Sequence, residues 1–468
     1  MLYRTTLVVA FVVACGPSAR ERGDDTNSCT PGEVGACYDG VGGTEDVGPC
    51  HGGQHTCGGD GMWGPCVGEI VPQPEDCTNG IDDNCNGMVD EDIDQDGDGF
   101  TTCSGHDCCD STECTDPALV NPGAFDAPGN GVDDDCDGVV DNSVPLCDSG
   151  LASNSSMGMD YAKAIDLCQV TTATDPKWGV IDASFSLADG GGSPTSKSHS
   201  IRPRFGTGVT PQIGNSFIEL STGAAAGMGD VNPDYQDFEA GGGEGKSSGF
   251  PTDWFNANQM KLPNAPNCPA PNPFSAANDP VMLTLHIKVP TNAKSFAMSV
   301  NFFSSEFPEY TCSPFNDFFV VLLDSKYAGA NPNPTDKNLA FYQPPNSTDK
   351  FPVGVNLATG NTGLFTQCVN GHIGCEAGQL NKSINTCTSQ AMLAGTGLDK
   401  ADGGECDGNS VEGGGTGWLL TSGNVVGGEV ITLRIAIWDT SDGMLDSIAI
   451  IDGFTWNVDE AQPGTVIF

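Results

Sequence analysis

Basic residues are scarce in this sequence of 468 residues. Eighteen Lys and Arg stand against 62 Asp and Glu, so the formal net charge is −44 at pH 7. A field of that sign repels nucleic acid and anionic lipid surfaces, which argues against both as electrostatic partners. Hydrophobic residues make up only 38% of the chain, whereas Gly (63) and Pro (31) are plentiful. This balance disfavours a long helical bundle and favours turn-rich β structure.

Lys and Arg are absent altogether between Arg22 and Lys163, a stretch that contains 30 acidic residues. That much uncompensated negative charge opposes compaction unless something neutralises it. Bound divalent cations are the simplest candidate, and an acidic, solvated linker is the alternative. Because the acids are regularly spaced, we expect the cations.

Long apolar runs are also missing, apart from a short one at residues 5–14 that follows Arg4. A positive residue followed by a brief apolar run is typical of a secretory signal. The run is too short to span a bilayer. The letters VVAC, which end at Cys15, are similar to the lipobox of bacterial lipoproteins. This resemblance implies a signal peptide of residues 1–14 and a lipidated Cys15 that starts a tether of residues 15–28. Gly16 favours the outer membrane, and a plain signal peptide is the alternative.

The chain has 21 cysteines, and removing Cys15 leaves an even 20 for disulfides in an oxidising compartment. Residues 29–74 form a Cys- and Gly-rich module, for which we expect a disulfide scaffold. Zinc bound by Cys50, His51, His55 and Cys57 is the alternative, but the module has no CxxC pair, the usual zinc-binding unit.

Residues 79–90 recur as residues 130–141. Counted from Asp82 and from Asp133, each copy has oxygen side chains at positions 1, 3 and 5, Gly at 6 and Asp at 9. This spacing is the start of a calcium loop, although the Glu at position 12 is missing. A third run at residues 94–100 repeats the D-x-D-x-D-G core, and two more Asp follow it. The predicted calcium ligands are Asp82, Asn84, Asn86, Asp90, Asp94, Asp96, Asp98, Asp107, Asp110, Asp133, Asp135, Asp137 and Asp141.

The same residues resemble the Cys-rich metal-binding repeat named after MopE, within a region of residues 75–145. Pro128 departs from the repeat where the first copy has Cys77, and Asn86 replaces an Asp. The family name suggests copper. Copper and zinc nevertheless prefer His, Cys thiolate or Met, and His106 is the region's only histidine, so we expect calcium.

Residues 160–468 are the only part able to bury a large core. Pro, Gly and Asn separate apolar runs at residues 281–289, 296–303, 318–323, 430–438 and 448–456. We therefore expect a mainly β chain, in which a disulfide-rich, cation-binding N-terminal segment precedes a β-sandwich or jelly roll. A short helix is expected at residues 160–167.

This region also resembles the choice-of-anchor L family, in the runs FFSSEF, FNDFF, TLRIAIWDTSDG and DSIAIIDGF. The resemblance implies a β domain of the bacterial cell surface without an established activity. Members usually carry a C-terminal sorting anchor, and we expect the lipid at Cys15 to serve instead.

An enzyme is the less favoured hypothesis. The GxSxG match at residues 245–249 lacks the strand and helix of a nucleophile elbow. Five acids of the β domain supply either the two catalytic carboxylates of a glycosidase or a second cation or ligand site. They are Glu306, Asp317, Asp439, Asp442 and Asp446. We expect a cell-surface lipoprotein whose head binds a glycan, the matrix or a protein, with a surface hydrolase as the alternative.

Overall fold

The computed structural model describes residues 29–73, 75–92, 94–110, 114–142, 145–239, 245–272, 276–375, 383–401, 406, 411–440 and 443–467. Cys15 and Asp442 lie outside these residues. The chain divides into two compact units. One unit ends at Ile93 and includes Thr101–Ser104, and the other consists of Asp94–Phe100 and Gly105–Phe468. Among the described residues, none of the helices combines the length and the hydrophobicity that a membrane span needs.

The first unit is held together by disulfides around one small hairpin. Strands β1 (Val34–Cys37) and β2 (Gly53–Thr56) pair antiparallel. Its disulfides join Cys29 to Cys57, Cys37 to Cys66, Cys50 to Cys85, and Cys77 to Cys103. Cys50 and Cys57 are therefore oxidised and offer no thiolate, and His55 stacks on Trp63 with ring centroids 3.9 Å apart. The expected disulfide scaffold is confirmed, and the zinc alternative is wrong.

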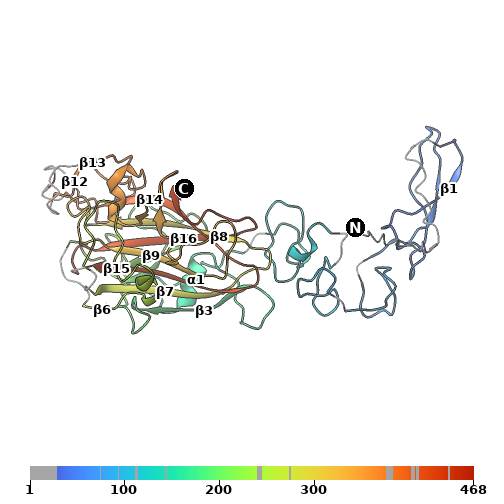
Figure 1. The fold of residues 1–468 in the computed structure, drawn as a ribbon, viewed down its shortest axis with the longest axis horizontal. Coiled ribbons are helices and arrows are strands. Elements are labelled where there is room, and N and C mark those ends of the chain that lie inside the picture. The colour runs from blue at the N-terminus through green and yellow to red at the C-terminus, as the bar shows by residue number, and fades with distance from the viewer. Residues whose placement is uncertain are drawn as a thin grey trace, which may run out of the picture. The chain divides into compact units, whose positions relative to one another are not determined.

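The second unit contains an antiparallel sandwich of two sheets (Figure 1). One sheet has the strand order β17-β14-β8-β16-β5-β4, and the other has the order β3-β7-β15-β9, with β6 paired to β7. The strands are β3 (Gly179–Ser186), β4 (His199–Arg202), β5 (Phe217–Ser221), β6 (Ser247–Ser248), β7 (Ala277–Lys288), β8 (Ser295–Ser304), β9 (Phe318–Asp324), β14 (Gly414–Asn424), β15 (Val430–Thr440), β16 (Ser447–Asn457) and β17 (Gly464–Ile467).

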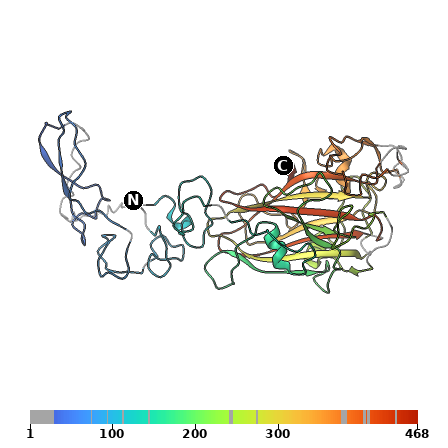
Figure 2. The same ribbon diagram turned by 180° about the vertical axis from the view of Figure 1, so that it is seen from behind.

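Smaller elements decorate the sandwich. Two short hairpins are formed by β10 (Phe341–Tyr342) with β11 (Phe351–Pro352), and by β12 (Gly371–Ile373) with β13 (Ser383–Asn385). The helical segments are η1 (Pro117–Leu119), α1 (Gly158–Ala164), α2 (Thr252–Ala257) and η2 (Val355–Asn361). Helix α1, coloured teal in Figure 2, packs against β3. It is the helix expected at residues 160–167, begun two residues earlier and ended at Ala164.

The period of two in the apolar runs explains the two layers, because alternate residues of a strand face opposite sides of its sheet. In β15, Leu433, Ile435 and Ile437 face the main core between the sheets, while Ala436 and Trp438 face outward. A slip of one residue would exchange the two faces, so the register is strongly specified. All five predicted runs become strands, namely β7, β8, β9, β15 and β16. The prediction of a mainly β sandwich is confirmed.

The outer face of the five-stranded sheet carries a second, aromatic cluster under α2. The Trp254 ring lies edge-on to Trp438 at 5.5 Å, and Phe318 stacks on Trp438 at 5.6 Å. Both Trp side chains are fully buried, so α2 is anchored to the sheet by apolar contact. The stretch of residues 245–249 contributes only the two-residue strand β6, without a nucleophile elbow.

Six further disulfides stabilise the second unit. They join Cys108 to Cys136, Cys109 to Cys114, Cys147 to Cys168, Cys268 to Cys312, Cys368 to Cys387, and Cys375 to Cys406. All 20 cysteines after Cys15 are thus paired in ten disulfides. So many disulfides indicate an oxidising, extracytoplasmic compartment.

His199 in β4 makes the stability of the sandwich depend on pH. Its ring is buried, stacks on Phe185 at 4.1 Å and shares a 2.6 Å hydrogen bond with the Tyr161 hydroxyl. Burial lowers the pKa of His199 from 6.5 to about 4. The unfolded chain therefore takes up this proton first, so stability present above pH 6.5 is lost as the pH falls towards 4.

We predict that His199→Gln removes this part of the acid sensitivity, which amounts to about 3 kcal/mol at full effect. Gln retains a side-chain amide that can hydrogen-bond to the Tyr161 hydroxyl but does not titrate. Urea unfolding of both proteins between pH 7 and pH 4 measures the difference. Parallel pH profiles for the two proteins would contradict the assignment to His199.

Candidate metal centre

Three Asp-rich loops share one pattern of hydrogen bonds. In each loop, the Asp at position 1 accepts two backbone N–H groups from further along the loop. The side chains at positions 3 and 5 each accept the backbone N–H of the residue two positions ahead. This pattern curls each loop around its own oxygen atoms. The loops contain Asp82, Asn84 and Asn86; Asp94, Asp96 and Asp98; and Asp133, Asp135 and Asp137.

The glycine at the sixth position permits the curl. Gly87, Gly99 and Gly138 have φ values of 95°, 97° and 92°. A side chain at these positions would be strained, because L-residues other than glycine rarely adopt such values. The spacing read from the sequence therefore has a direct structural cause.

The second loop is completed by residues that follow it, and together they form what we call the five-carboxylate cluster: Asp94, Asp96, Asp98, Asp107 and Asp110. One oxygen from each of Asp94, Asp96 and Asp98 lies within 4.8 Å of the others, and the same holds for Asp96, Asp107 and Asp110. Asp96 belongs to both groups. All five residues were predicted as ligands, and the structure brings them together within the second unit.

The five-carboxylate cluster has a buried end, formed by Asp107 and Asp110, whereas Asp96 and Asp98 are half-buried and Asp94 is exposed. Asp107 is 3% exposed and Asp110 is 5% exposed. One oxygen of Asp107 accepts the Cys109 N–H at 2.8 Å, whereas Oδ2 of Asp107 and Oδ2 of Asp96 are buried without a hydrogen-bond partner among the described residues. Burial, followed by the charges of the neighbouring acids, raises the pKa of Asp107 to about 7. The same causes raise the pKa of Asp98 to about 6.

The third loop brings a second carboxylate group together. Oxygen atoms of Asp133, Asp135 and Asp137 lie within 4.8 Å of one another. Burial and the charge of Asp137 raise the pKa of Asp135 to about 6. The neighbouring sulfur atoms of Cys108 and Cys136 are joined in a disulfide and offer no thiolate.

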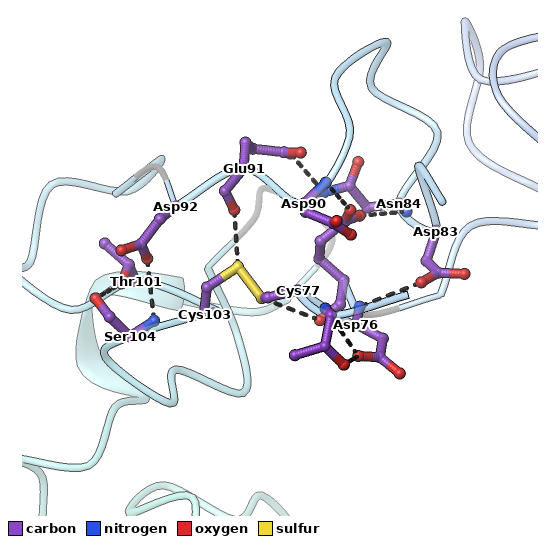
Figure 3. Close-up of a disulfide and its surroundings, with 12 residues drawn as sticks. Asp76, Cys77, Asp83, Asn84, Asp90, Glu91, Asp92, Thr101, Cys103 and Ser104 are labelled. Carbon is purple, nitrogen blue, oxygen red and sulfur yellow. Dashed lines mark hydrogen bonds between the residues drawn. A yellow bond between two sulfur atoms is a disulfide. The ribbon is translucent and has the colours of Figure 1, made fainter. Parts of the chain in front are cut away.

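The first loop, in the other unit, has amides where the third loop has carboxylates. The side-chain nitrogens of Asn84 and Asn86 both donate to Oε1 of Glu91, and Glu75 accepts the N–H groups of Asn84 and Asp90. Glu75 and Glu91 were missed as functional candidates because they lie outside the D-x-D-x-D spacing. Figure 3 shows Asn84, Asp90 and Asp83 on one side of the Cys77–Cys103 disulfide and Asp92, Thr101 and Ser104 on the other.

Two predicted ligands accept hydrogen bonds from backbone N–H groups of their own repeat. Asp90 accepts the Gly80 N–H, and Asp141 accepts the N–H groups of Gly129, Asn130 and Gly131. Within the described residues, neither belongs to a carboxylate group given above. The hydrogen bond from Gly80 to Asp90 has an equivalent 51 residues further along the chain, from Gly131 to Asp141. The sequence repeat is therefore also a structural repeat.

The five-carboxylate cluster is bonded to the sandwich through Asn121. The Asn121 amide donates to Asp98 at 2.7 Å and accepts from the Thr291 hydroxyl at 2.7 Å. Thr291 follows β7, and its N–H donates to the Gly123 carbonyl at 3.0 Å. The order of the cluster is therefore coupled to a turn of the sandwich.

The acids predicted in the β domain lie at one end of the sandwich. Glu306, Asp317 and Asp439 are 3%, 2% and 1% exposed, and Asp446 is partly exposed. A glycosidase needs two carboxylates beside an open substrate cleft. None of these four acids lines either of the two grooves that the described residues form beside α1 and α2.

The larger groove, about 690 Å³, lies between α2 and the outer face of the five-stranded sheet. Its lining includes Ser184, Thr284 and Arg434, which are register partners on β3, β7 and β15. Arg434 donates two hydrogen bonds, of 3.0 and 2.6 Å, to Asp253 of α2. A neighbouring groove of about 500 Å³ shares Ser184 and Phe185 with it.

Comparison with protein families matches residues 70–91 and 115–142 to the Cu-binding MopE family, described as a "Putative metal-binding motif". No curated protein and no solved structure matches the chain. The matched segments cover the first and third loops, whereas the five-carboxylate cluster falls between them.

The donor atoms do not fit copper. Copper sites use imidazole, thiolate or thioether ligands, whereas the three loops offer carboxylate and amide oxygens. The cysteines beside the loops form disulfides. The chain therefore has a region with a metal-binding motif, followed by a β-rich domain.

Proposed function

We propose that this chain is an extracytoplasmic lipoprotein whose acidic loops bind calcium and whose β-sandwich binds a surface ligand. The observation that carries the calcium proposal is the convergence of two groups of three carboxylates that share Asp96. Asp96 and Asp107 each have a buried oxygen without a hydrogen-bond partner in the described part of the chain. Calcium takes six to eight oxygen ligands at flexible geometry, which suits a cluster built from two loop segments.

Electrostatics favours the same ion. The carboxylates of the cluster repel one another, and the pKa values of Asp98 and Asp107 are raised for that reason as well as by burial. A divalent cation compensates this charge without any basic side chain. The missing position-12 Glu argues for weak affinity, with a Kd on the order of 10⁻⁴–10⁻³ M as in other extracellular modules.

We predict that Asp96→Asn combined with Asp107→Asn removes calcium binding at the cluster. Calcium should stabilise the wild-type protein by about 2.7 kcal/mol at a hundredfold excess over Kd. The variant should lose the part of this stabilisation that comes from calcium bound at the cluster. Isothermal titration calorimetry measures binding, and limited proteolysis with calcium or chelator measures the ordering of residues 94–142.

Asp116→Asn is the matched control, because Asp116 is exposed in the same unit and lies outside the cluster. Its φ of 54° also suits Asn. Equal calcium binding by the double variant and the control would contradict the proposal, and so would wild-type proteolysis that calcium leaves unchanged.

The membrane attachment is proposed from the sequence VVAC alone. Two or three acyl chains on Cys15 would anchor the protein firmly, which a single chain does not. We predict that Cys15→Ser moves the protein from the membrane to the soluble fraction. Fractionation and mass spectrometry of the N-terminal peptide check this. Membrane retention of the wild type without an acyl chain would contradict it.

The proposed ligand of the sandwich is a glycan, and the support is the groove beside α2. Ser184, Thr284 and Arg434 place hydrogen-bonding groups in a row across three strands, and Asn256 of α2 also lines the groove. Sugar hydroxyls need such groups. The choice-of-anchor L resemblance agrees with a cell-surface role.

We predict that Thr284→Ala combined with Asn256→Ala weakens glycan binding by about tenfold or more, because it removes two polar contacts while the Arg434–Asp253 pair remains. A glycan array followed by titration of the best binder measures this. Thr348→Ala is the control, because Thr348 is exposed and does not line the groove. Unchanged affinity in the double variant would place the ligand elsewhere.

A further inference from the structure

The two grooves of the sandwich share one side. The loop of residues 187–198, which connects β3 to β4, lines the larger groove with its first half and the smaller groove with its second half. Ser184 and Phe185 of β3 line both. The two grooves are therefore consecutive parts of one feature, which we call the extended groove. The loop residues that line it are Asp189, Gly190 and Gly192 in the larger part, and Ser193, Pro194 and Ser196 in the smaller part.

The opposite side of the extended groove changes along its length. In the larger part it is formed by α2, through Thr252, Asp253 and Asn256. In the smaller part it is formed by residues 154–159, which lead into α1. The groove thus passes from one helix to the other along the end of β3, instead of ending in a single pocket.

The extended groove is longer than one sugar ring. Arg434, Thr284 and Ser184 are register partners on the adjacent strands β15, β7 and β3. Neighbouring strands lie about 4.8 Å apart, so this row alone spans about 10 Å. Beyond Ser184, the smaller part adds about 500 Å³ to the about 690 Å³ of the larger part. A single sugar would fill only a fraction of this space.

Uncharged polar side chains line the smaller part. Asn154, Ser156, Ser193 and Ser196 are all exposed there. Among the described residues that line it, His199 is the only one with an ionisable side chain, and burial lowers the pKa of His199 to about 4. Its ring is therefore neutral at pH 7. Amides and hydroxyls both donate and accept hydrogen bonds, as sugar hydroxyls do.

The larger part does not attract anions. Arg434 is the one basic residue in its described lining, and its guanidinium donates two hydrogen bonds to Asp253. Asp189 adds an exposed acid to the same lining. The net charge of −44 also repels an anionic ligand. These charges favour an uncharged chain of sugars over an acidic one.

We propose that the extended groove binds several consecutive sugars of a linear, uncharged polysaccharide. This inference rests on the proposed glycan-binding function and specifies the class of glycan. Sugars of one chain occupy the larger part beside α2 and the smaller part beside α1 at the same time. Affinity therefore rises with chain length until both parts are filled, and Asn154 and Ser196 contribute only when the chain is long enough to reach them.

The test is isothermal titration calorimetry of the full chain with oligosaccharides of defined length. Each linear hexasaccharide is compared with the disaccharide of the same sugar and linkage. The uncharged probes are cellohexaose, maltohexaose, xylohexaose, mannohexaose and chitohexaose, and hexagalacturonate is the anionic probe. We expect an uncharged hexasaccharide to bind about tenfold or more tightly than its disaccharide, and more tightly than hexagalacturonate.

Two double variants separate the parts of the groove. Asn154→Ala combined with Ser196→Ala should raise the Kd of the hexasaccharide about tenfold and leave that of the disaccharide unchanged, because only the longer chain reaches the smaller part. Thr284→Ala combined with Asn256→Ala should weaken the binding of both. Asn331→Ala combined with Thr335→Ala is the matched control, because both residues are exposed and line neither part.

The possible outcomes distinguish this inference from the function on which it rests. A hexasaccharide that binds no more tightly than its disaccharide, or that is unaffected by the Asn154 and Ser196 changes, would overturn the extended groove and leave glycan binding beside α2 in place. Tighter binding of hexagalacturonate would overturn the choice of an uncharged chain. Absence of binding by every probe would overturn the glycan proposal and this inference together.

Discussion

Repulsion between carboxylates is the constraint on which the N-terminal third of the molecule depends. The chain carries 30 acids without a single Lys or Arg between Arg22 and Lys163. Such a segment cannot collapse around a core, since it has few large apolar residues to bury. Disulfides limit how far it expands, and backbone N–H groups bond to the leading acid of each loop. The oxygens that converge in the clusters still repel one another, and a cation or protons must compensate them.

The five-carboxylate cluster connects this constraint to the sandwich. Asp98, Asn121 and Thr291 form a continuous hydrogen-bonded chain from the cluster to the turn after β7. Asn292 holds the Phe125 backbone through two further bonds, and the Phe125 ring enters the main core. A cluster without its counter-charge would therefore disturb more than its own loop. Through these contacts, the cation occupancy proposed for the cluster would affect how firmly residues 121–125 are attached to the sandwich.

Spacing in the sequence predicted the features that depend on local geometry. Apolar runs separated by Pro, Gly and Asn became strands, and the D-x-D-x-D-G core became curled loops. Strand β14 was not predicted, because its Gly-rich sequence is held as a strand by its neighbours β8 and β17. Glu75 and Glu91 have no recognisable spacing, whereas Asp90 and Asp141 fit the spacing but bind backbone N–H groups. The path of the chain decides which acid faces a cation, and the disulfides that set this path cannot be paired from one sequence.

Buried acids elsewhere in the sandwich show what ordinary compensation requires. Glu219 is fully buried, but the Ser200 hydroxyl donates to one of its oxygens at 2.9 Å and Arg202 lies at 4.0 Å. Asp452 is equally buried and accepts backbone N–H groups from the segment before β5. Among the described residues, Asp439 has neither a basic partner, as Glu219 has, nor a backbone donor, as Asp452 has. Because a chain with only 18 basic residues cannot pair every buried acid, a proton on the carboxyl is the physically consistent compensation for Asp439, whose pKa is raised well above its ordinary value by burial and by the charges of Asp317 and Asp446.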